Sequence, residues 1–206
     1  MSNEQIRALG LQELERISQI NKNAVEWKTW LTDYQFLYPD DSFIWFTNIL
    51  ALKAVDDGNF GVGCILIDGN GNIVSQGNNE VFSPYFRSDR HAEMVVMDKF
   101  EDTHPDIHKK EVYTLYTSLE SCPMCLVRLI TSDVNKVLYA ASDSWGGMVS
   151  RMAEMPSLWI ELCEGKVFSQ ANCSQELINA ANDIFLLNLN ELLEKIKNRK
   201  NNQNHY

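Results

Sequence analysis

Four side chains in two short segments could bind a metal and move protons. The first segment is His91-Ala92-Glu93, and the second is Cys122-Pro123-Met124-Cys125. One imidazole and two thiolates are ligands that zinc prefers, and three protein ligands leave the fourth tetrahedral position open. The Glu93 carboxylate is placed to take and return protons at a water in that position. Because a structural zinc site uses four protein ligands, the pattern predicts a hydrolytic zinc site.

Both segments fall where the sequence predicts the start of a helix. His91 follows a helix-capping aspartate, and Cys122 directly precedes Pro123, a residue typical of the first helical turn. A helix N-terminus carries partial positive charge and unpaired N–H groups, which favour a thiolate over a thiol. Cys122 and Cys125 are three residues apart, so both sulfur atoms can face one point. His91 and Glu93 are two apart and diverge, so we expect Glu93 to lie beside the metal.

Each half of this pattern has other interpretations. A lone Cys-x-x-Cys could be a redox pair, but the segment 117–120 lacks the bulky apolar lead-in expected of thioredoxin-like proteins. A lone His-x-Glu usually belongs to a surface helix. We expect Glu120 to hold the turn before Cys122 by hydrogen bonds. The two halves together are more specific than either alone, so the sequence favours a functional zinc site.

The composition is that of one globular domain that carries an extension. The chain has 206 residues, of which 45% are hydrophobic and 22% charged, enough for a sizeable core. It lacks the ~18 uninterrupted apolar residues of a membrane span, and its N-terminus does not resemble a signal peptide. Two of the five cysteines form the Cys-x-x-Cys pair. These features fit a reducing compartment, so we expect a cytoplasmic protein without a membrane partner.

The net charge bears on the substrate. The chain carries a formal charge of −10 and has a sequence pI of about 4.8. Proteins that bind nucleic acid neutralise phosphates with clustered lysine and arginine, whereas these residues are scattered here. A short basic run at residues 195–200 has the character of a solvated helix end that complements the helix dipole. Acidity therefore disfavours a nucleic-acid partner and favours a small substrate.

Hydrophobic periodicity predicts alternating helices and strands. Helices are expected at 3–20, 23–37, 42–56, 90–100 and 123–130, with a C-terminal helical region at 176–197. A β-hairpin is expected at 62–77 around the turn Asp68-Gly69-Asn70-Gly71, and further strands at 112–117 and 136–140. This order predicts a mixed sheet flanked by helices.

At these residues the chain resembles the cytidine deaminase-like superfamily, whose zinc signature is H-x-E followed by P-C-x-x-C. Within the superfamily it is most similar to the branch of guanine deaminases and tRNA adenosine deaminases. The residues that carry this resemblance are Gly63–Ile67, Gly77-Asn78-Asn79, Thr117–Cys125 and Tyr139–Asp143. It covers residues 42–197, and residues 1–40 have no counterpart.

The resemblance implies an α/β fold with three α-β-α layers around a mixed five-stranded sheet, and a homodimer. A helical N-terminal extension would occupy residues 1–40, and a zinc-dependent deaminase domain residues 41–206. His91, Cys122 and Cys125 would bind one zinc ion per chain, and Glu93 would move protons. The extension could cover the core, close over the pocket or enlarge a dimer interface, and packing against the core is the simplest expectation.

Four further residues are expected to contact the substrate. Asn79 matches an asparagine that hydrogen-bonds the substrate ring in this branch, although an ordinary turn residue is the alternative. Trp145 and Asp143 follow the strand at 136–140, where relatives have pocket loops. The indole could stack on a flat base or fill the core. Ser121 precedes the first cysteine of the zinc signature. The tyrosine at the last position, Tyr206, is a further resemblance to guanine deaminases, in which the C-terminal end approaches the active site.

The chain departs from the family pattern at two places. Ser121 stands where relatives usually have proline, which loosens a backbone constraint without changing the ligand spacing. The segment Arg87-Ser88-Asp89-Arg90 replaces Asp-Pro-Thr-Ala before the zinc histidine. Its arginines could pair with a phosphate or carboxylate of a ligand, but we expect them to pair with the acidic residues of the protein.

The main hypothesis is a zinc-dependent hydrolytic deaminase that acts on a free nucleobase or nucleoside, a purine of the guanine type. The alternative within the same chemistry is a tRNA adenosine deaminase that acts on a flipped-out base. The alternative of another class is a catalytically silent zinc protein whose residues 1–40 bind a partner.

Overall fold

The computed structural model describes residues 1–17, 22–105 and 112–201, so Tyr206 and the end of the helix predicted at 3–20 lie outside the described residues. The elements follow one another as α1 (Asn3–Arg16), α2 (Lys22–Asp33), α3 (Asp41–Asp56), β1 (Gly63–Ile67), β2 (Ile73–Asn78), α4 (Ala92–Thr103), β3 (Tyr113–Leu119), α5 (Pro123–Thr131), β4 (Val134–Ala141), the 3-10 helix η1 (Val149–Glu154), α6 (Ser157–Leu162), β5 (Val167–Gln170), α7 (Gln175–Leu186) and α8 (Leu189–Asn201).

The strands form the mixed five-stranded sheet that the resemblance implies. Their order is β2-β1-β3-β4-β5. β1 is antiparallel to β2 and β3, whereas β3, β4 and β5 run parallel. Hydrophobic periodicity does not predict β5, because this edge strand has four residues and none of them is buried. A short edge strand gives little of the alternation on which such predictions rest.

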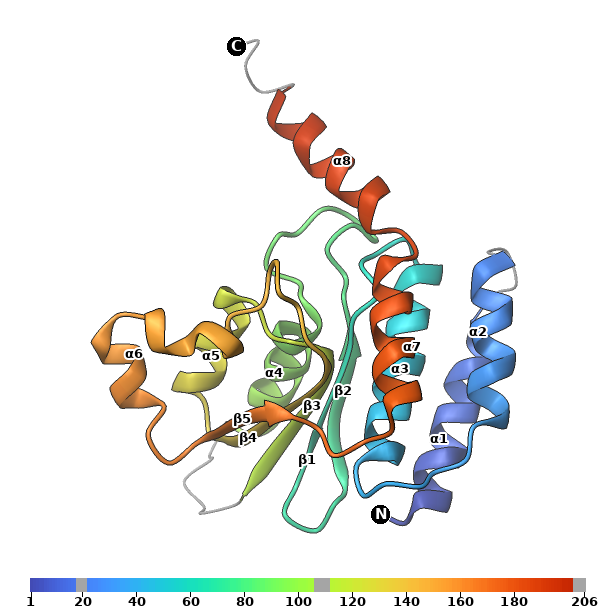
Figure 1. Cartoon of the computed structure of the whole chain (residues 1–206), viewed down its shortest axis with the longest axis horizontal. Helices are drawn as coiled ribbons and strands as arrows, with labels where there is room; N and C mark the ends of the chain where they lie inside the picture. The colour runs from blue at the N-terminus through green and yellow to red at the C-terminus, as the bar shows by residue number, and fades with distance from the viewer. Residues whose placement is uncertain (18–21, 106–111, 202–206) are drawn as a thin grey trace.

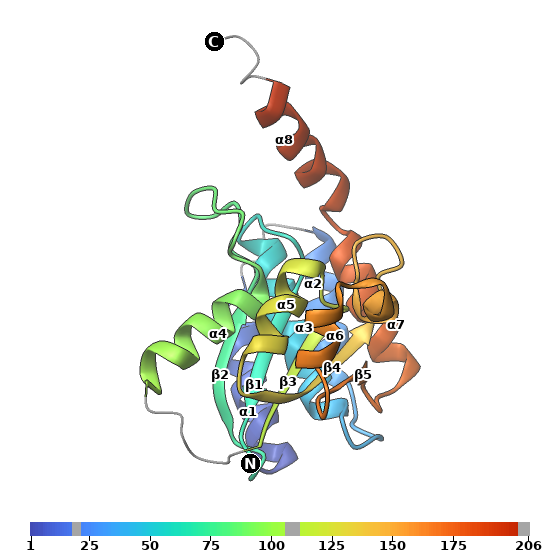
Figure 2. The same cartoon turned by 90° about the vertical axis from the view of Figure 1, so that its left-hand side faces the viewer.

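Helices cover both faces of the sheet. α3 and α7 pack on one face, and α4 and α5 pack on the other (Figure 1). α6 lies beside α5, and α8 projects from the body of the protein beyond α7 in both views (Figure 2). The three-layer α-β-α prediction is therefore confirmed. Among the described residues, no helix is both long and apolar enough to cross a membrane.

The N-terminal helices add a layer outside α3. Ile6 and Leu14 of α1 and Leu31 of α2 are buried in the same core cluster as α3. The indole N–H of Trp45 on α3 donates to the Leu31 carbonyl oxygen at 2.7 Å. The guanidinium of Arg7 lies 4.3 Å from the centroid of the Phe36 ring, within cation–π range. Helices α1 and α2 therefore cover the outer side of α3.

Several element ends differ from the sequence prediction. The second helix ends at Asp33 and not at residue 37, because the buried Asp41 carboxylate accepts hydrogen bonds from the N–H groups of Leu37 and Tyr38 and folds that segment into a turn. The predicted region 176–197 is two helices that meet at Asn188. The Asn188 side chain donates to the carbonyl oxygen of Asn59 at 2.6 Å, which fixes the break between them.

We predict that Gly10→Ala destabilises the protein although alanine favours helices by about 1 kcal/mol. A Cβ atom at residue 10 would lie 2.2 Å from a ring carbon of Trp45 and 2.9 Å from Ile49 Cδ1. Both side chains are fully buried, so one of them must move, at a cost of about 1–3 kcal/mol. Denaturant unfolding measures the loss. Gly69→Ala is the control, because its Cβ would meet only one atom, at 3.7 Å. Equal stability of the two variants would contradict this packing.

Candidate metal centre and its cavity

The two segments predicted to bind zinc meet at the starts of two helices. His91 is the N-cap residue of α4, and Cys122 is the N-cap residue of α5, with Pro123 at the first position of that helix. The ligand atoms of His91, Cys122 and Cys125 all lie within 4.8 Å of one another. The Cys122 sulfur is 3.5 Å from Nδ1 of His91. Residues 31 positions apart in the sequence are thus brought together by the fold.

This geometry fits a tetrahedral zinc ion. Zinc–sulfur bonds of about 2.3 Å and zinc–nitrogen bonds of about 2.0–2.1 Å place a sulfur and a nitrogen ligand about 3.6 Å apart. The 3.5 Å between Cys122 Sγ and His91 Nδ1 agrees with that separation. Three protein ligands leave one position for a small ligand, which distinguishes this centre from a four-ligand structural site.

The charges of the site favour a cation. A hydrogen bond from Cys125, together with the interaction with His91, lowers the pKa of the Cys122 thiol to about 4. Burial opposes protonation of His91, but its hydrogen bond with Cys122 and the charge of that group outweigh burial and raise the imidazole pKa. Because zinc binds thiolates and neutral imidazole, a metal ion at this site would displace any protons that the three ligands hold.

Glu93 lies beside the ligands, as its sequence position predicts. Its side chain is 4% exposed and contributes to the cavity next to His91 and Cys122. Burial raises the pKa of the Glu93 carboxyl group, and the negative charge of Cys122 raises it further. The Ser121 hydroxyl donates to Glu93 Oε1 at 2.9 Å and acts in the opposite direction. A buried carboxylate with a raised pKa accepts protons more readily, as a general base requires.

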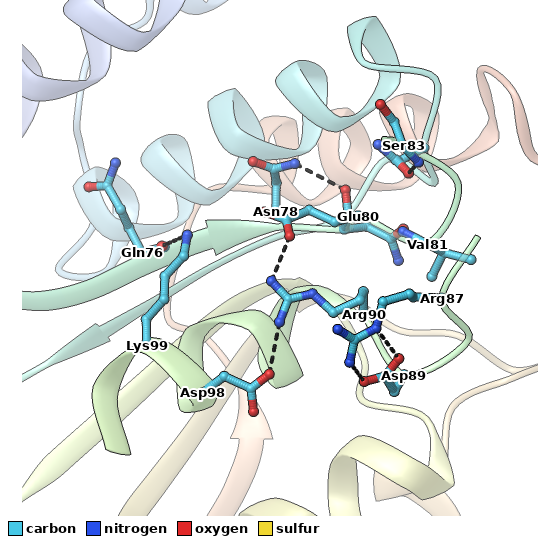
Figure 3. A network of polar contacts seen from close by, with 12 residues as sticks. Gln76, Asn78, Glu80, Val81, Ser83, Arg87, Asp89, Arg90, Asp98 and Lys99 are labelled. Atoms are coloured by element: carbon cyan, nitrogen blue, oxygen red, sulfur yellow. Dashed lines mark hydrogen bonds and ion pairs between the residues drawn. The ribbon is translucent and has the colours of Figure 1, made fainter. Parts of the chain in front are cut away.

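An ion-pair network joins the helices that carry these residues, and Figure 3 shows the part of it around Arg90. Arg90, next to His91, pairs with Glu80 at 2.6 Å and with Asp98 of α4 at 2.8 Å. Asp98 also pairs with Arg128 of α5 at 2.5 Å. One carboxylate therefore connects the loop before His91 with both helices. Networks of this kind hold geometry better than isolated surface pairs.

The arginines before the zinc histidine pair with the acidic residues of the protein, as expected. Arg87 forms an ion pair with Asp89, and Arg90 is fully engaged in the network (Figure 3). Glu120 has a structural role, but in the loop after β4 and not in the turn before Cys122, where the sequence predicts it. Its carboxylate accepts hydrogen bonds from the N–H groups of Asp143 and Ser150 and so fixes the loop after β4.

A cavity of about 260 Å³ opens onto the metal ligands. Its lining comes from the segment between α3 and β1, the end of β2, the starts of α4 and α5, the loop after β4, and the C-terminal helices. The lining residues are Phe60, Val62, Asn79, His91, Ala92, Glu93, Leu119, Glu120, Cys122, Asp143, Trp145, Gly146, Phe185, Leu189 and Leu193. Three of the four predicted substrate contacts line this cavity, and Ser121 does not.

The predicted contacts differ in what they can offer a ligand. Asn79 accepts from the Val81 N–H through its amide oxygen, so its NH2 group is the one available to a ligand. The Asp143 carboxylate accepts from the N–H groups of Trp145 and Gly146, and so shapes the turn at the cavity. Trp145 is 74% exposed, so its indole does not fill the core. Their contact with substrate stays a prediction.

The C-terminal wall of the cavity was not predicted. Phe185 of α7 and Leu189 and Leu193 of α8 reach the site from the end of the described chain. Arg199 holds α8 against the loop before α4, with its guanidinium 3.9 Å from the centroid of the Phe86 ring. In the sequence these residues have only the apolar spacing of an amphipathic helix, which does not tell a cavity wall from a core face.

We predict one zinc ion per chain, lost when either thiolate is removed. Cys122→Ala and Cys125→Ala each leave two protein ligands, so zinc content measured by elemental analysis falls from one per chain to near zero. Cys163→Ala is the matched control, because this free cysteine lies outside the ligand cluster and its sulfur is 3.6 Å from that of Met152. Full zinc content in the Cys122→Ala protein would show that the cluster does not hold the metal.

Residues 40–141 match the sequence model of the family described as the cytidine and deoxycytidylate deaminase zinc-binding region. A tRNA-specific adenosine deaminase of Bacillus subtilis is 37% identical over 97 residues, which are 47% of this chain and 58% of that protein. A probable cytosine deaminase of Schizosaccharomyces pombe is 30% identical over 109 residues, 52% of this chain and 64% of that protein. The chain thus spans about three fifths of these curated relatives.

Solved structures share the fold. The structure of guanine deaminase from Nitrosomonas europaea aligns with a TM-score of 0.56 over 76% of this chain and 91% of that chain, at 15% sequence identity. Residues 40–141, which match the family model, include His91, Glu93, Cys122 and Cys125 at the helix starts described above. Residues 40–141 therefore carry the zinc-binding region of the cytidine and deoxycytidylate deaminase family, with an intact His/Cys/Cys metal site.

Proposed function

We propose that this protein is a hydrolytic deaminase that removes an exocyclic amino group from a nucleobase. The observation that carries the proposal is the placement of Glu93 in the same cavity as a three-ligand metal centre. A carboxylate that touches the cavity without belonging to the ligand cluster is free to move protons. Neither a structural zinc site nor a redox pair of cysteines requires such a group.

The residues of the cavity divide the reaction between them. His91, Cys122 and Cys125 would hold the zinc ion, which would supply the Lewis acidity that lowers the pKa of a water toward about 7. Glu93 takes a proton from the attacking water while the water oxygen forms a bond to the amine-bearing ring carbon. Glu93 then gives that proton to the amino nitrogen, the carbon–nitrogen bond breaks, and ammonia leaves. The proton count balances without another catalytic group.

The substrate that we propose is a free nucleobase or nucleoside, and specifically a purine of the guanine type. The cavity volume of 260 Å³ lies below the ~300–1,000 Å³ of sites for drug-sized ligands. Phe60, Leu189 and Leu193 give it apolar walls suited to a flat ring, and the Asn79 NH2 group can donate to a ring acceptor.

The charges around the cavity support a small substrate. The chain carries a formal charge of −10. Lys195 and Lys197 of α8 form ion pairs within that helix, and Arg87 of the loop before α4 pairs with Asp89. Cations that are already paired attract phosphates less strongly than free ones. A small uncharged base needs no such attraction.

The direct test is ammonia release by the zinc-loaded protein from guanine, adenine, cytosine and their nucleosides. We predict that Glu93→Gln lowers turnover by about 10²–10⁴-fold and keeps one zinc per chain, because it removes the base and leaves the ligands. Glu101→Gln is the control on the same helix. Its carboxylate pairs with Arg128 at the surface, so turnover should be kept.

Two outcomes would contradict this account. Retained turnover in the Glu93→Gln protein would show that Glu93 is not the base. Absence of ammonia from every member of the panel would overturn deamination of a free base or nucleoside. Without tRNA deamination as well, that result would favour a catalytically silent zinc protein whose residues 1–40 bind a partner.

The second candidate is deamination of an adenosine in tRNA, and the comparisons with known proteins favour it over the first. Relatives from Bacillus subtilis, Danio rerio, Xenopus laevis and Aquifex aeolicus carry the name tRNA-specific adenosine deaminase. The exposed Trp145 beside the cavity offers a ring on which a base next to a flipped-out nucleotide could stack.

Binding of tRNA at several salt concentrations decides between the two candidates. The free-base proposal predicts weak binding and no inosine in tRNA after incubation with the zinc-loaded protein. The tRNA candidate predicts an observed binding constant that falls steeply with salt, by about 0.7–0.9 logarithmic units per phosphate contact for each tenfold increase, together with inosine formation. The Glu93→Gln protein separates the two readouts, because it should bind tRNA without forming inosine.

A further inference from the structure

The Glu93 carboxylate is held by a residue that does not line the cavity. The Ser121 hydroxyl donates to Glu93 Oε1 at 2.9 Å. Ser121 is fully buried and Glu93 is 4% exposed, so this hydrogen bond is shielded from bulk water. Glu93 lines the cavity and Ser121 does not. The hydroxyl therefore approaches the carboxylate from the protein side and leaves the substrate side open.

The backbone around Ser121 fixes the position of its hydroxyl. The Ser121 carbonyl oxygen accepts from the Met148 N–H at 2.9 Å, and the N–H of the preceding Glu120 donates to the Ala141 carbonyl oxygen at 2.8 Å. The next residue, Cys122, is both the N-cap of α5 and a metal ligand. Strand β4, the loop after it and helix α5 thus all constrain the segment that carries the serine.

We propose that Ser121 is a positioning residue for the proton transfer by Glu93, an inference that rests on the proposed function. The last torsion of a glutamate side chain has a broad preference, so the carboxylate has little intrinsic orientation. A buried hydrogen bond to one oxygen selects one orientation. Proline, which the family signature has at this position, has no hydroxyl to donate. In this chain the Ser121 hydroxyl therefore orients the Glu93 carboxylate. Ser121 acts through Glu93 and not on the substrate.

A positioning role predicts a specific kinetic effect. Ser121→Ala should lower kcat about tenfold, which corresponds to the loss of about 1.4 kcal/mol of transition-state stabilisation. KM should stay within about twofold, because Ser121 does not touch the cavity. Zinc content should stay at one per chain. Ser121→Thr keeps a hydroxyl and should recover most of kcat.

Ser118→Ala is the matched control. Ser118 is also a fully buried serine, two residues before Glu120, and its hydroxyl accepts from the Gly63 N–H at 3.1 Å. Removing it leaves a buried donor unpaired, which should lower the melting temperature and leave kcat unchanged. A merely structural role of Ser121 would give the same result as this control.

A thermal-unfolding cycle on the zinc-loaded protein tests the contact without using activity. The variants are Ser121→Ala, Glu93→Ala and the double variant. If the hydroxyl binds the carboxylate, the double variant should lose less stability than the sum of the two single losses. An additive cycle, loss of zinc from Ser121→Ala, or an unchanged kcat in that variant would each overturn the proposal. Failure of the proposed function would instead be seen as no ammonia release from the unmodified chain.

Discussion

The N-termini of α4 and α5 converge beyond the end of β3, and this convergence brings an imidazole, two sulfur atoms and a carboxylate into one small volume. Each helix start contributes unpaired N–H groups and partial positive charge, which stabilise a thiolate before any metal is present. Asp98 holds the arrangement from outside, because it pairs with Arg90 before α4 and with Arg128 on α5. The metal ligands, Glu93 and Ser121 all depend on this meeting of two helices.

Helix α3 is buried along almost its whole length, and part of that burial depends on the N-terminal helices. α3 lies between the sheet and the N-terminal helices, and its Trp45 reaches Leu31 of α2 by a hydrogen bond. Without α1 and α2 the outer apolar side of α3 would face water. Among the described residues of 1–40, none lines the cavity, so the extension supports the fold on the side away from the chemistry.

Sequence patterns predicted the features that depend on neighbouring residues, namely the helix starts and most of the strands. The ligand types, their spacing and the proline at the start of α5 were visible in the sequence, so His91, Cys122 and Cys125 could be assigned to one metal centre. The expected aspartate cap of α4 was wrong, because His91 itself is the N-cap and Asp89 pairs with Arg87. The sheet up to β4 followed from apolar runs and turn residues. The short strand β5 and the cavity wall of Leu189 and Leu193 could not be predicted, because their positions depend on where α7 and α8 pack. The hydrogen bond between Ser121 and Glu93 likewise joins residues whose closeness exists only in the folded chain.

Deamination by water can be followed with isotope-labelled solvent. The zinc-loaded protein is incubated in water enriched in oxygen-18 with the base or nucleoside from which it releases most ammonia. Mass spectrometry then measures the mass of the product. Hydrolysis with Glu93 as the base predicts one oxygen-18 atom bonded to the deaminated ring carbon for each ammonia released, and labelled product formed about 10²–10⁴-fold more slowly by the Glu93→Gln protein. Unlabelled product, or labelled product formed equally by the Glu93→Gln protein, would contradict the mechanism.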